Sequence, residues 1–158
     1  MSVKNENIGD NDRLTTPEFW DSCYQGREPV PFNDKNWRNY ASIQLVRLIE
    51  SLKLNEKRVC EVGGGDAEVS AYLAGKYKGS EFSIIDYSPL GCALARKRAA
   101  LESVEINVLQ SDFFSPPLEL CGYFDLVTSY GVVEHFSDLS SVLKAKSILI
   151  KIQEKFLH

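Results

Sequence analysis

The sequence predicts an α/β fold built on a doubly wound, Rossmann-like parallel sheet. Short apolar runs at 59–62 and 81–86 alternate with longer segments of helical periodicity, such as 89–101. The first run leads into three consecutive glycines, which are followed by the start of a helix. A strand, a glycine turn and a helix N-terminus in this order form a nucleotide-binding corner of an α/β sheet.

Length and composition indicate one globular domain. The chain has 158 residues, of which 44% are hydrophobic and 25% charged. Residues 1–14 are polar and are expected to be disordered, which leaves 15–158 as a single domain. The net charge of -4 argues against a nucleic-acid partner, and no apolar run is long enough to span a membrane. The four cysteines are widely spaced, so we expect reduced thiols in a cytoplasmic protein and no metal site.

The glycine corner favours one class of ligand over another. A dinucleotide fingerprint, G-x-G-x-x-G, would place Glu68 where the third glycine is needed, which disfavours NAD. The alternative spacing, E-x-G-x-G-x-G, is matched by Glu61, Gly63 and Gly65, with Ala67 for the last glycine. A glycine-rich turn without any ligand also remains open.

This second spacing resembles motif I of the class I S-adenosylmethionine (SAM)-dependent methyltransferases. The resemblance implies SAM as cofactor, with Glu61, Gly63 and Gly65 in its site. It further implies that an aromatic-rich lead-in, here 15–39, folds over the cofactor. An equally weighted alternative is that these aromatic residues cover the bottom of the core.

The end of the second strand supplies an acid about 20 residues beyond the glycine turn, where a carboxylate can accept the hydrogen bonds of a ribose diol. That acid is Asp86. It could instead cap the next helix, but Ser88 followed by Pro89 fits the cap better. We therefore assign Asp86 to the ribose. The resemblance places the next residue, Tyr87, against the adenine.

Two further strands, 105–109 and 124–129, complete the pattern. After the third strand, the resemblance assigns Asp112 to the adenine amino group and Phe113 to an adjacent contact, although core packing of Phe113 is also possible. After the fourth strand it places Tyr130 beside the methionine part of SAM. Glu134 and His135 follow; in the family this pair usually supports the loop, and we assign no catalytic residue.

The C-terminal part departs from the family pattern. Residues 139–158 read as one amphipathic helix, so the sheet is expected to have four strands in the order 3-2-1-4 and to be truncated after the fourth strand and its helix. The fourth strand would then be an open edge, through which the chain would self-associate or bind a partner chain.

The sequence thus predicts a SAM-dependent methyltransferase that acts on a small-molecule acceptor. The alternative is a non-catalytic SAM-binding or interaction module derived from a truncated methyltransferase. An NAD-dependent oxidoreductase is disfavoured by Glu68. The identity of the acceptor, and whether its nitrogen, oxygen, sulfur or carbon is methylated, is left open.

Overall fold

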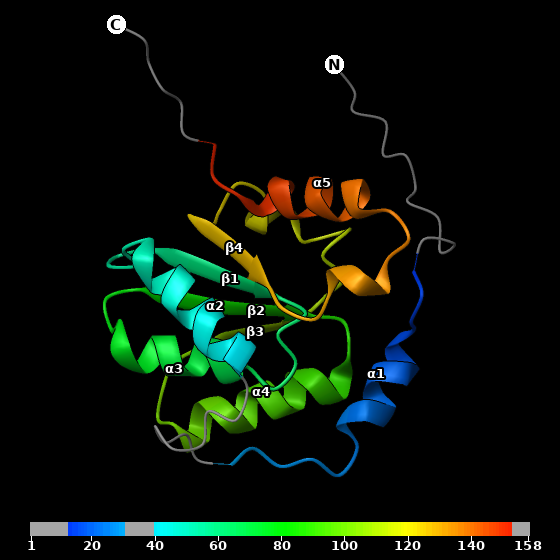
Figure 1. The fold of residues 1–158 in the computed structure, drawn as a ribbon, viewed down its shortest axis with the longest axis horizontal. Helices are drawn as coiled ribbons and strands as arrows, with labels where there is room; N and C mark the ends of the chain where they lie inside the picture. Colours follow the sequence, from blue (N-terminus) through cyan, green and yellow to red (C-terminus); the bar gives the residue numbers. More distant parts are fainter. Residues whose placement is uncertain (1–12, 31–39, 153–158) are drawn as a thin grey trace, which may run out of the picture.

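A computed structural model describes residues 13–30 and 40–152, and its centre is a four-stranded parallel sheet. The strand order is β3-β2-β1-β4, which confirms the predicted order (Figure 1). The strands are β1 (Arg58–Val62), β2 (Glu81–Asp86), β3 (Asn107–Gln110) and β4 (Leu126–Ser129). The helices are α1 (Pro17–Tyr24), α2 (Tyr40–Ser51), α3 (Glu68–Lys76), α4 (Pro89–Leu101) and α5 (Leu139–Leu149), with short 3₁₀ turns at Leu118–Leu120 and Val133–His135.

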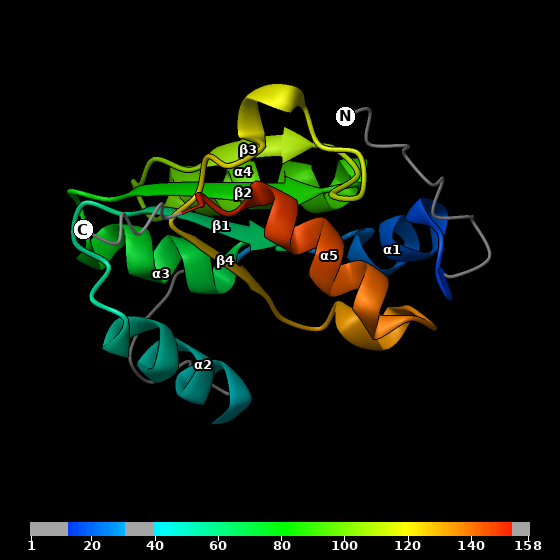
Figure 2. The same ribbon diagram turned by 90° about the horizontal axis from the view of Figure 1, so that it is seen from above.

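Helices lie on both faces of the sheet, with α5 on one face and α2, α3 and α4 on the other. Because side chains alternate along a strand, β1 supplies both layers. Cys60 and Val62 pack in the layer that contains Leu149 of α5, whereas Val59 packs in the layer beneath α2 and α3. Strands buried on both faces explain why the sequence shows continuous apolar runs there. Figure 2 shows that α5 crosses the sheet and that α1 lies beyond one end of the strands.

Helix α4 begins as predicted but buries a different face. The Ser88 hydroxyl accepts the Gly91 N–H at 2.9 Å, and Pro89 occupies the first turn. The consecutive basic residues Arg96, Lys97 and Arg98 predict a solvated face on this helix, and for Arg98 this prediction is wrong. Its side chain is buried, and its guanidinium donates to the Val30 carbonyl at 2.5 Å and to Asp66 at 3.2 Å. Tertiary partners on two distant segments supply these acceptors, so helical periodicity alone did not reveal them.

Helix α2 buries only part of the apolar set that its sequence spaces for one helical face, namely Leu45, Leu48, Ile49 and Leu52. Ser42, Val46 and Ile49 are buried, whereas Leu48 is 63% exposed. The helix packs against α3 with a narrow face, so only part of its apolar surface is covered.

The end of the described chain corrects two expectations. Helix α5 stops at Leu149, and Ile150 is extended (φ -82°, ψ 134°), so 139–158 is not one helix. Ile150 forms a parallel bridge with Phe124: the Phe124 N–H donates to Leu149 O at 3.0 Å and the Lys151 N–H donates to Phe124 O at 2.8 Å. A segment after the helix therefore does pair beside the start of β4, because the unsatisfied backbone groups of that edge offer bonds that a helix cannot make.

At the other end, the described residues begin at Arg13. Arg13 forms an antiparallel bridge with Phe136, and the Leu14 N–H donates to His135 O at 2.9 Å. Arg13 and Leu14 thus contact the folded domain although they belong to the stretch that the sequence predicts to be disordered. Residues 1–12, and the stretch 31–39 with Phe32 and Trp37, lie outside the described residues. Among the described helices, none has the length and apolar character needed to cross a membrane.

Candidate functional site

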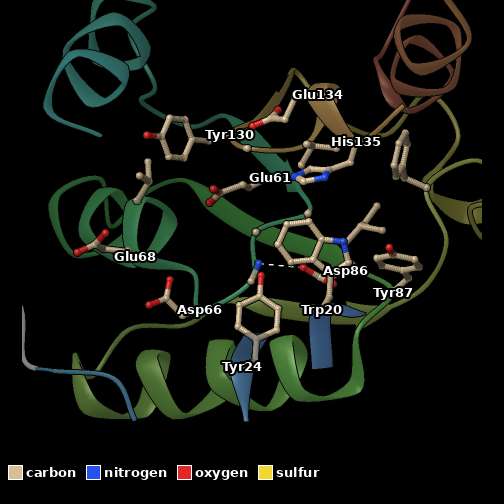
Figure 3. Close-up of a pocket in the computed structure, with 18 of the residues that line it drawn as sticks. Trp20, Tyr24, Glu61, Asp66, Glu68, Asp86, Tyr87, Tyr130, Glu134 and His135 are labelled. Carbon is tan, nitrogen blue, oxygen red and sulfur yellow. Dashed lines mark hydrogen bonds between the residues drawn. The ribbon is translucent and has the colours of Figure 1, made fainter. Parts of the chain in front are cut away.

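A cavity of about 490 Å³ opens where the carboxyl ends of the strands meet α1 (Figure 3). Ligands of open α/β sheets bind at this edge, beside the point where the strand order reverses. All eight residues selected from the sequence line it: Glu61, Gly63, Gly65, Asp86, Tyr87, Asp112, Phe113 and Tyr130. The structure thus brings together, in one place, positions that span 70 residues of the chain.

The glycine corner forms one wall of the cavity and needs glycine at two positions. Gly63 and Gly65 have φ of +66° and +50°, in the left-handed region that other residues rarely adopt. A Cβ on Gly63 would lie 2.4 Å from Val132 Cγ2, and one on Gly65 would lie 2.3 Å from the Tyr24 hydroxyl. Ala67 also adopts a positive φ, +58°, where the motif has its last glycine. This replacement therefore carries a strain of about 1 kcal/mol.

Asp86 fastens the glycine corner to the rest of the sheet. Its carboxylate accepts the Gly65 N–H at 2.9 Å, drawn as the dashed line at Asp86 in Figure 3. It also accepts the Ser88 N–H at 2.8 Å. Burial raises the pKa of Asp86, although these backbone hydrogen bonds oppose the rise. Since a carboxylate has about four acceptor positions, these bonds leave acceptor capacity for a ligand. The N-terminal cap of α4 is made by the Ser88 side chain and not by Asp86. The ribose role proposed for Asp86 therefore does not compete with a capping role.

Glu61 is the most perturbed acid of the cavity. Its side chain is buried at the end of β1 and accepts a hydrogen bond from the Ser70 hydroxyl. Burial is the main cause that raises the pKa of Glu61 to about 7, and the nearby Asp66 and Asp86 add to it. The hydrogen bond from Ser70 acts in the opposite direction. A cationic ligand in the cavity would favour the ionised form of Glu61.

The described residues that line the cavity carry an excess of negative charge. The acids are Glu61, Asp66, Glu68, Asp86, Asp112 and Glu134, and the guanidinium groups are Arg13 and Arg27. Arg13 is already paired with Asp112. Figure 3 shows Glu61, Asp66, Glu68 and Glu134 on the side of the cavity away from Tyr87. Such a field favours a ligand with positive charge and opposes a diphosphate.

The opposite end of the cavity is aromatic. Phe113 and Phe114 contact each other with ring centroids 4.4 Å apart, and both contact Phe136. Phe113 is buried and also lines the cavity, so it serves the core and the cavity wall at once. Asp112 accepts the Phe114 N–H at 2.9 Å, which fixes its carboxylate at this end.

Helix α1 closes the cavity with residues that sequence analysis did not assign to the site. Trp20 and Tyr24 line the cavity, with the Trp20 ring 6.1 Å from the Tyr24 ring and 4.7 Å from the ring of His135. Asp21 anchors the helix by accepting hydrogen bonds from the Ser88 hydroxyl at 2.5 Å and from the Leu90 N–H at 3.2 Å. Trp20 and Tyr24 thus lie against the cavity and not at the bottom of the core.

Arg13 was missed altogether, because the polar residues around it predicted disorder. Its side chain lies in the cavity among aromatic rings, and no local sequence pattern indicates this. Glu134 and His135 also line the cavity.

A doubly wound sheet with a glycine turn after β1, an acid at the end of β2 and a cavity at the carboxyl edge defines a nucleotide- or nucleoside-binding α/β domain. Residues 60–151 match a family described as "Methyltransferase domain". Because this match covers more than half of the chain, the protein belongs to that family.

Similar proteins agree with this assignment. A ubiquinone biosynthesis O-methyltransferase from Azotobacter vinelandii is 32% identical over 102 residues, which are 65% of this chain and 43% of the relative. The chain therefore spans less than half the length of this relative.

Two solved structures share the fold. The first is titled "Conversion of a Disulfide Bond into a Thioacetal Group during Echinomycin Biosynthesis". It matches with a TM-score of 0.65 at 24% identity, and the alignment covers 85% of this chain and 55% of that one. The other is a SAM-dependent methyltransferase from Thiobacillus denitrificans in complex with S-adenosylhomocysteine. It has a TM-score of 0.57 at 19% identity, over 87% of this chain and 52% of that one.

The first prediction concerns Gly63, compared with Gly122, which also has a positive φ (+68°) but has no atom within 4 Å of an added Cβ. Gly63→Ala should lower the free energy of unfolding by about 2–4 kcal/mol, because backbone strain and the contact with Val132 add together. Gly122→Ala should lose only about 1–2 kcal/mol from strain. Urea denaturation measures both, and equal losses would show that Val132 moves aside freely.

The second prediction concerns Glu61 and pH. The folded protein holds the Glu61 proton up to a pKa of about 7, whereas the unfolded chain releases it near 4.5. The contribution of this group to stability is thus fully present below about pH 4.5 and is lost as the pH rises to about 7. In Glu61→Gln, the free energy of unfolding should no longer fall over this pH range by the contribution of Glu61, which is on the order of 1–3 kcal/mol.

Chemical denaturation between pH 4 and pH 8 measures this slope. Glu119→Gln is the matched control, because it removes the same charge from an exposed side chain outside the cavity. A pH profile of Glu61→Gln that is identical to that of the unsubstituted protein would contradict the assignment.

Proposed function

We propose that the cavity binds SAM and that the domain transfers its methyl group to a small-molecule acceptor. One observation carries this proposal: the eight residues that motif spacing singles out all line one cavity at the carboxyl ends of the strands. Membership of the methyltransferase-domain family supports it, as does the likeness to solved structures that hold S-adenosylhomocysteine.

The residues that line the cavity suit the purine, the ribose and the methionine part of SAM. We assign Tyr87, Asp112 and Phe113 to the purine and call them the purine subsite. Asp86 would accept the ribose hydroxyls with its remaining acceptor positions. The glycine corner and Tyr130 would border the methionine part.

The charge of the cavity supports SAM over NAD. SAM carries a sulfonium and an ammonium cation, and the carboxylate excess of the cavity would stabilise both. NAD carries a diphosphate, which this field would repel. Glu68 also lies in the cavity wall, at the point where a dinucleotide motif needs glycine.

SAM supplies an already activated methyl group, so the protein needs mainly to align the acceptor for in-line displacement. Trp20 and Tyr24 would exclude water from one side of the cavity.

The curated relatives are named ubiquinone biosynthesis O-methyltransferases, so we propose a hydroxyl oxygen of a small molecule as the acceptor. The net charge of -4 argues against nucleic acid as substrate.

We assign Glu134 and His135 to support of the loop after β4. The His135 carbonyl accepts the Leu14 N–H, and the His135 ring contacts the edge of Trp20. Both contacts hold neighbouring segments in place. The four cysteines are unpaired, which supports the proposal of a reducing, cytoplasmic location.

A second candidate function is a SAM-binding or interaction module without turnover. In the described part of the chain, β4 is the edge strand of the sheet. Apart from the bridge at Phe124, the described pairing of β4 is with β1. We propose that this edge accepts another strand, either from a second copy or from a partner chain.

The third prediction tests the cofactor. Isothermal calorimetry should show binding of SAM and S-adenosylhomocysteine, and no binding of NAD, because the acids of the cavity oppose a diphosphate. Incubation with SAM and catechol-type or other hydroxylated small molecules then separates the enzyme from the non-catalytic module. Tighter binding of NAD than of SAM would refute the proposal.

The same titrations should be repeated with Asp86→Asn. Loss of the charged acceptor should weaken binding of S-adenosylhomocysteine by about 1–3 kcal/mol. Asparagine keeps one oxygen acceptor, whereas alanine would leave two backbone N–H groups unpaired and lower stability as well. Asp125→Asn is the control, since Asp125 accepts the Arg58 N–H at 2.9 Å outside the cavity. Equal effects of the two substitutions would refute a ribose role.

The fourth prediction concerns the β4 edge. Among the described residues, β4 has no strand partner on its outer side apart from the bridge at Phe124. If this side pairs with a strand of another chain, the sedimentation coefficient should rise with protein concentration in the micromolar range. Analytical ultracentrifugation over a hundredfold range of concentration measures this. A monomer at every concentration would show that the edge is covered or does not pair.

A further inference from the structure

Arg13 lies at the aromatic end of the cavity, where its guanidinium contacts aromatic rings and a carboxylate. Its guanidinium carbon is 5.2 Å from the ring centroid of Phe114, 5.5 Å from that of Tyr87 and 5.9 Å from that of Phe136. The guanidinium also donates a hydrogen bond to the Asp112 carboxylate. The side chain is only 20% exposed, although it belongs to the first residues that the structure describes.

These partners overlap with the purine subsite. Tyr87 and Asp112 belong to it, and Phe114 and Phe136 adjoin its third member, Phe113. A guanidinium and an aminopurine offer similar chemistry: both are planar, both stack on aromatic faces, and both donate N–H groups to a carboxylate. Both groups would therefore compete for the same Asp112 oxygen and for the same ring faces.

Among the described residues, the segment that carries Arg13 is held mainly by hydrogen bonds, including one from the Trp20 indole N–H to the Thr15 hydroxyl at 3.1 Å. The antiparallel bridge to Phe136 and the hydrogen bond from the Leu14 N–H to His135 O (2.9 Å) fix its backbone. The Leu14 side chain is 63% exposed and adds little apolar burial. The Arg13–Asp112 pair is itself partly exposed, with Asp112 at 37%, so it is weak enough to exchange for another ligand.

We propose that Arg13 is an internal occupant of the purine subsite, which a purine-bearing cofactor must displace in order to bind. This inference rests on the proposed SAM site. The free protein would divide between a closed form, with Arg13 on Asp112, and an open form that is competent to bind. The apparent affinity for cofactor would be reduced by the fraction of the open form. Arg13 would thus set the affinity for cofactor without being a cofactor ligand.

The fifth prediction measures this competition. Arg13→Ala and Arg13→Gln should bind S-adenosylhomocysteine about five- to twentyfold more tightly than the unsubstituted protein, because the competing cation is removed. Lys97→Ala is the matched control: it also breaks an ion pair, with Glu28, but lies outside the cavity, so its affinity should be unchanged. Calorimetry measures all four proteins, and thermal unfolding checks that each is folded.

Equal or weaker binding by both Arg13 variants would overturn the proposal, while leaving the SAM site intact. Absence of binding by every protein would instead refute the SAM site, and the inference with it. Tighter binding in the Arg13 variants and not in Lys97→Ala supports both.

Hydrogen exchange of the Leu14 amide gives an independent readout. This amide is bonded to His135 O in the closed form, so it should be protected in the free protein. Saturation with S-adenosylhomocysteine should accelerate its exchange, because displacement of Arg13 releases the segment. Unchanged or stronger protection in the complex would show that the segment stays closed over the ligand, which contradicts displacement.

Discussion

The carboxylate of Asp86 is the constraint on which the site depends. It stands at the end of β2, in the centre of the sheet, and binds backbone N–H groups from two different connections. Through Gly65 it fixes the glycine corner that follows β1, and through Ser88 it fixes the turn into α4. A buried acid needs such partners, because a carboxylate removed from water without hydrogen bonds is costly. The same bonds leave acceptor positions that face the cavity.

The turn at Ser88 transmits this order to the N-terminal segment. Its hydroxyl caps α4 and donates to Asp21, and this second bond anchors α1 across the mouth of the cavity. Trp20 and Tyr24 reach the cavity only because the helix is held there. The closure of the site over the glycine corner is thus a consequence of one polar network that includes Asp86, Ser88 and Asp21.

The cavity is built at some cost to stability. Glu61 is buried, and its pKa is raised to about 7 because burial opposes its charge. The pKa of Glu68 is raised by burial and by the neighbouring Asp66. A protein optimised for stability alone would avoid these acids, whereas a site for a cation uses them. At the other end Arg13 neutralises Asp112, so the free protein satisfies part of the excess charge with its own side chain.

The sequence by itself determined the strand order and the set of residues at the carboxyl edge. Buried parallel strands read as apolar runs, and the residues just after each run meet at one edge of the sheet. This is why the sequence alone places Glu61, Asp86 and Asp112 at that edge, although their individual roles remain predictions.

The tertiary structure decided whatever depends on distant partners. Arg98 is buried because Val30 and Asp66 supply acceptors, and the helix expected over 139–158 ends at Leu149 because the edge beside Phe124 offers backbone bonds to Ile150. Arg13 gives the clearest case. Its polar neighbours predict disorder, and only the folded chain brings Asp112, 99 positions away, within hydrogen-bonding distance of its guanidinium. Local patterns report periodicity and turn chemistry, whereas pairings over such separations exist only once the sheet has assembled.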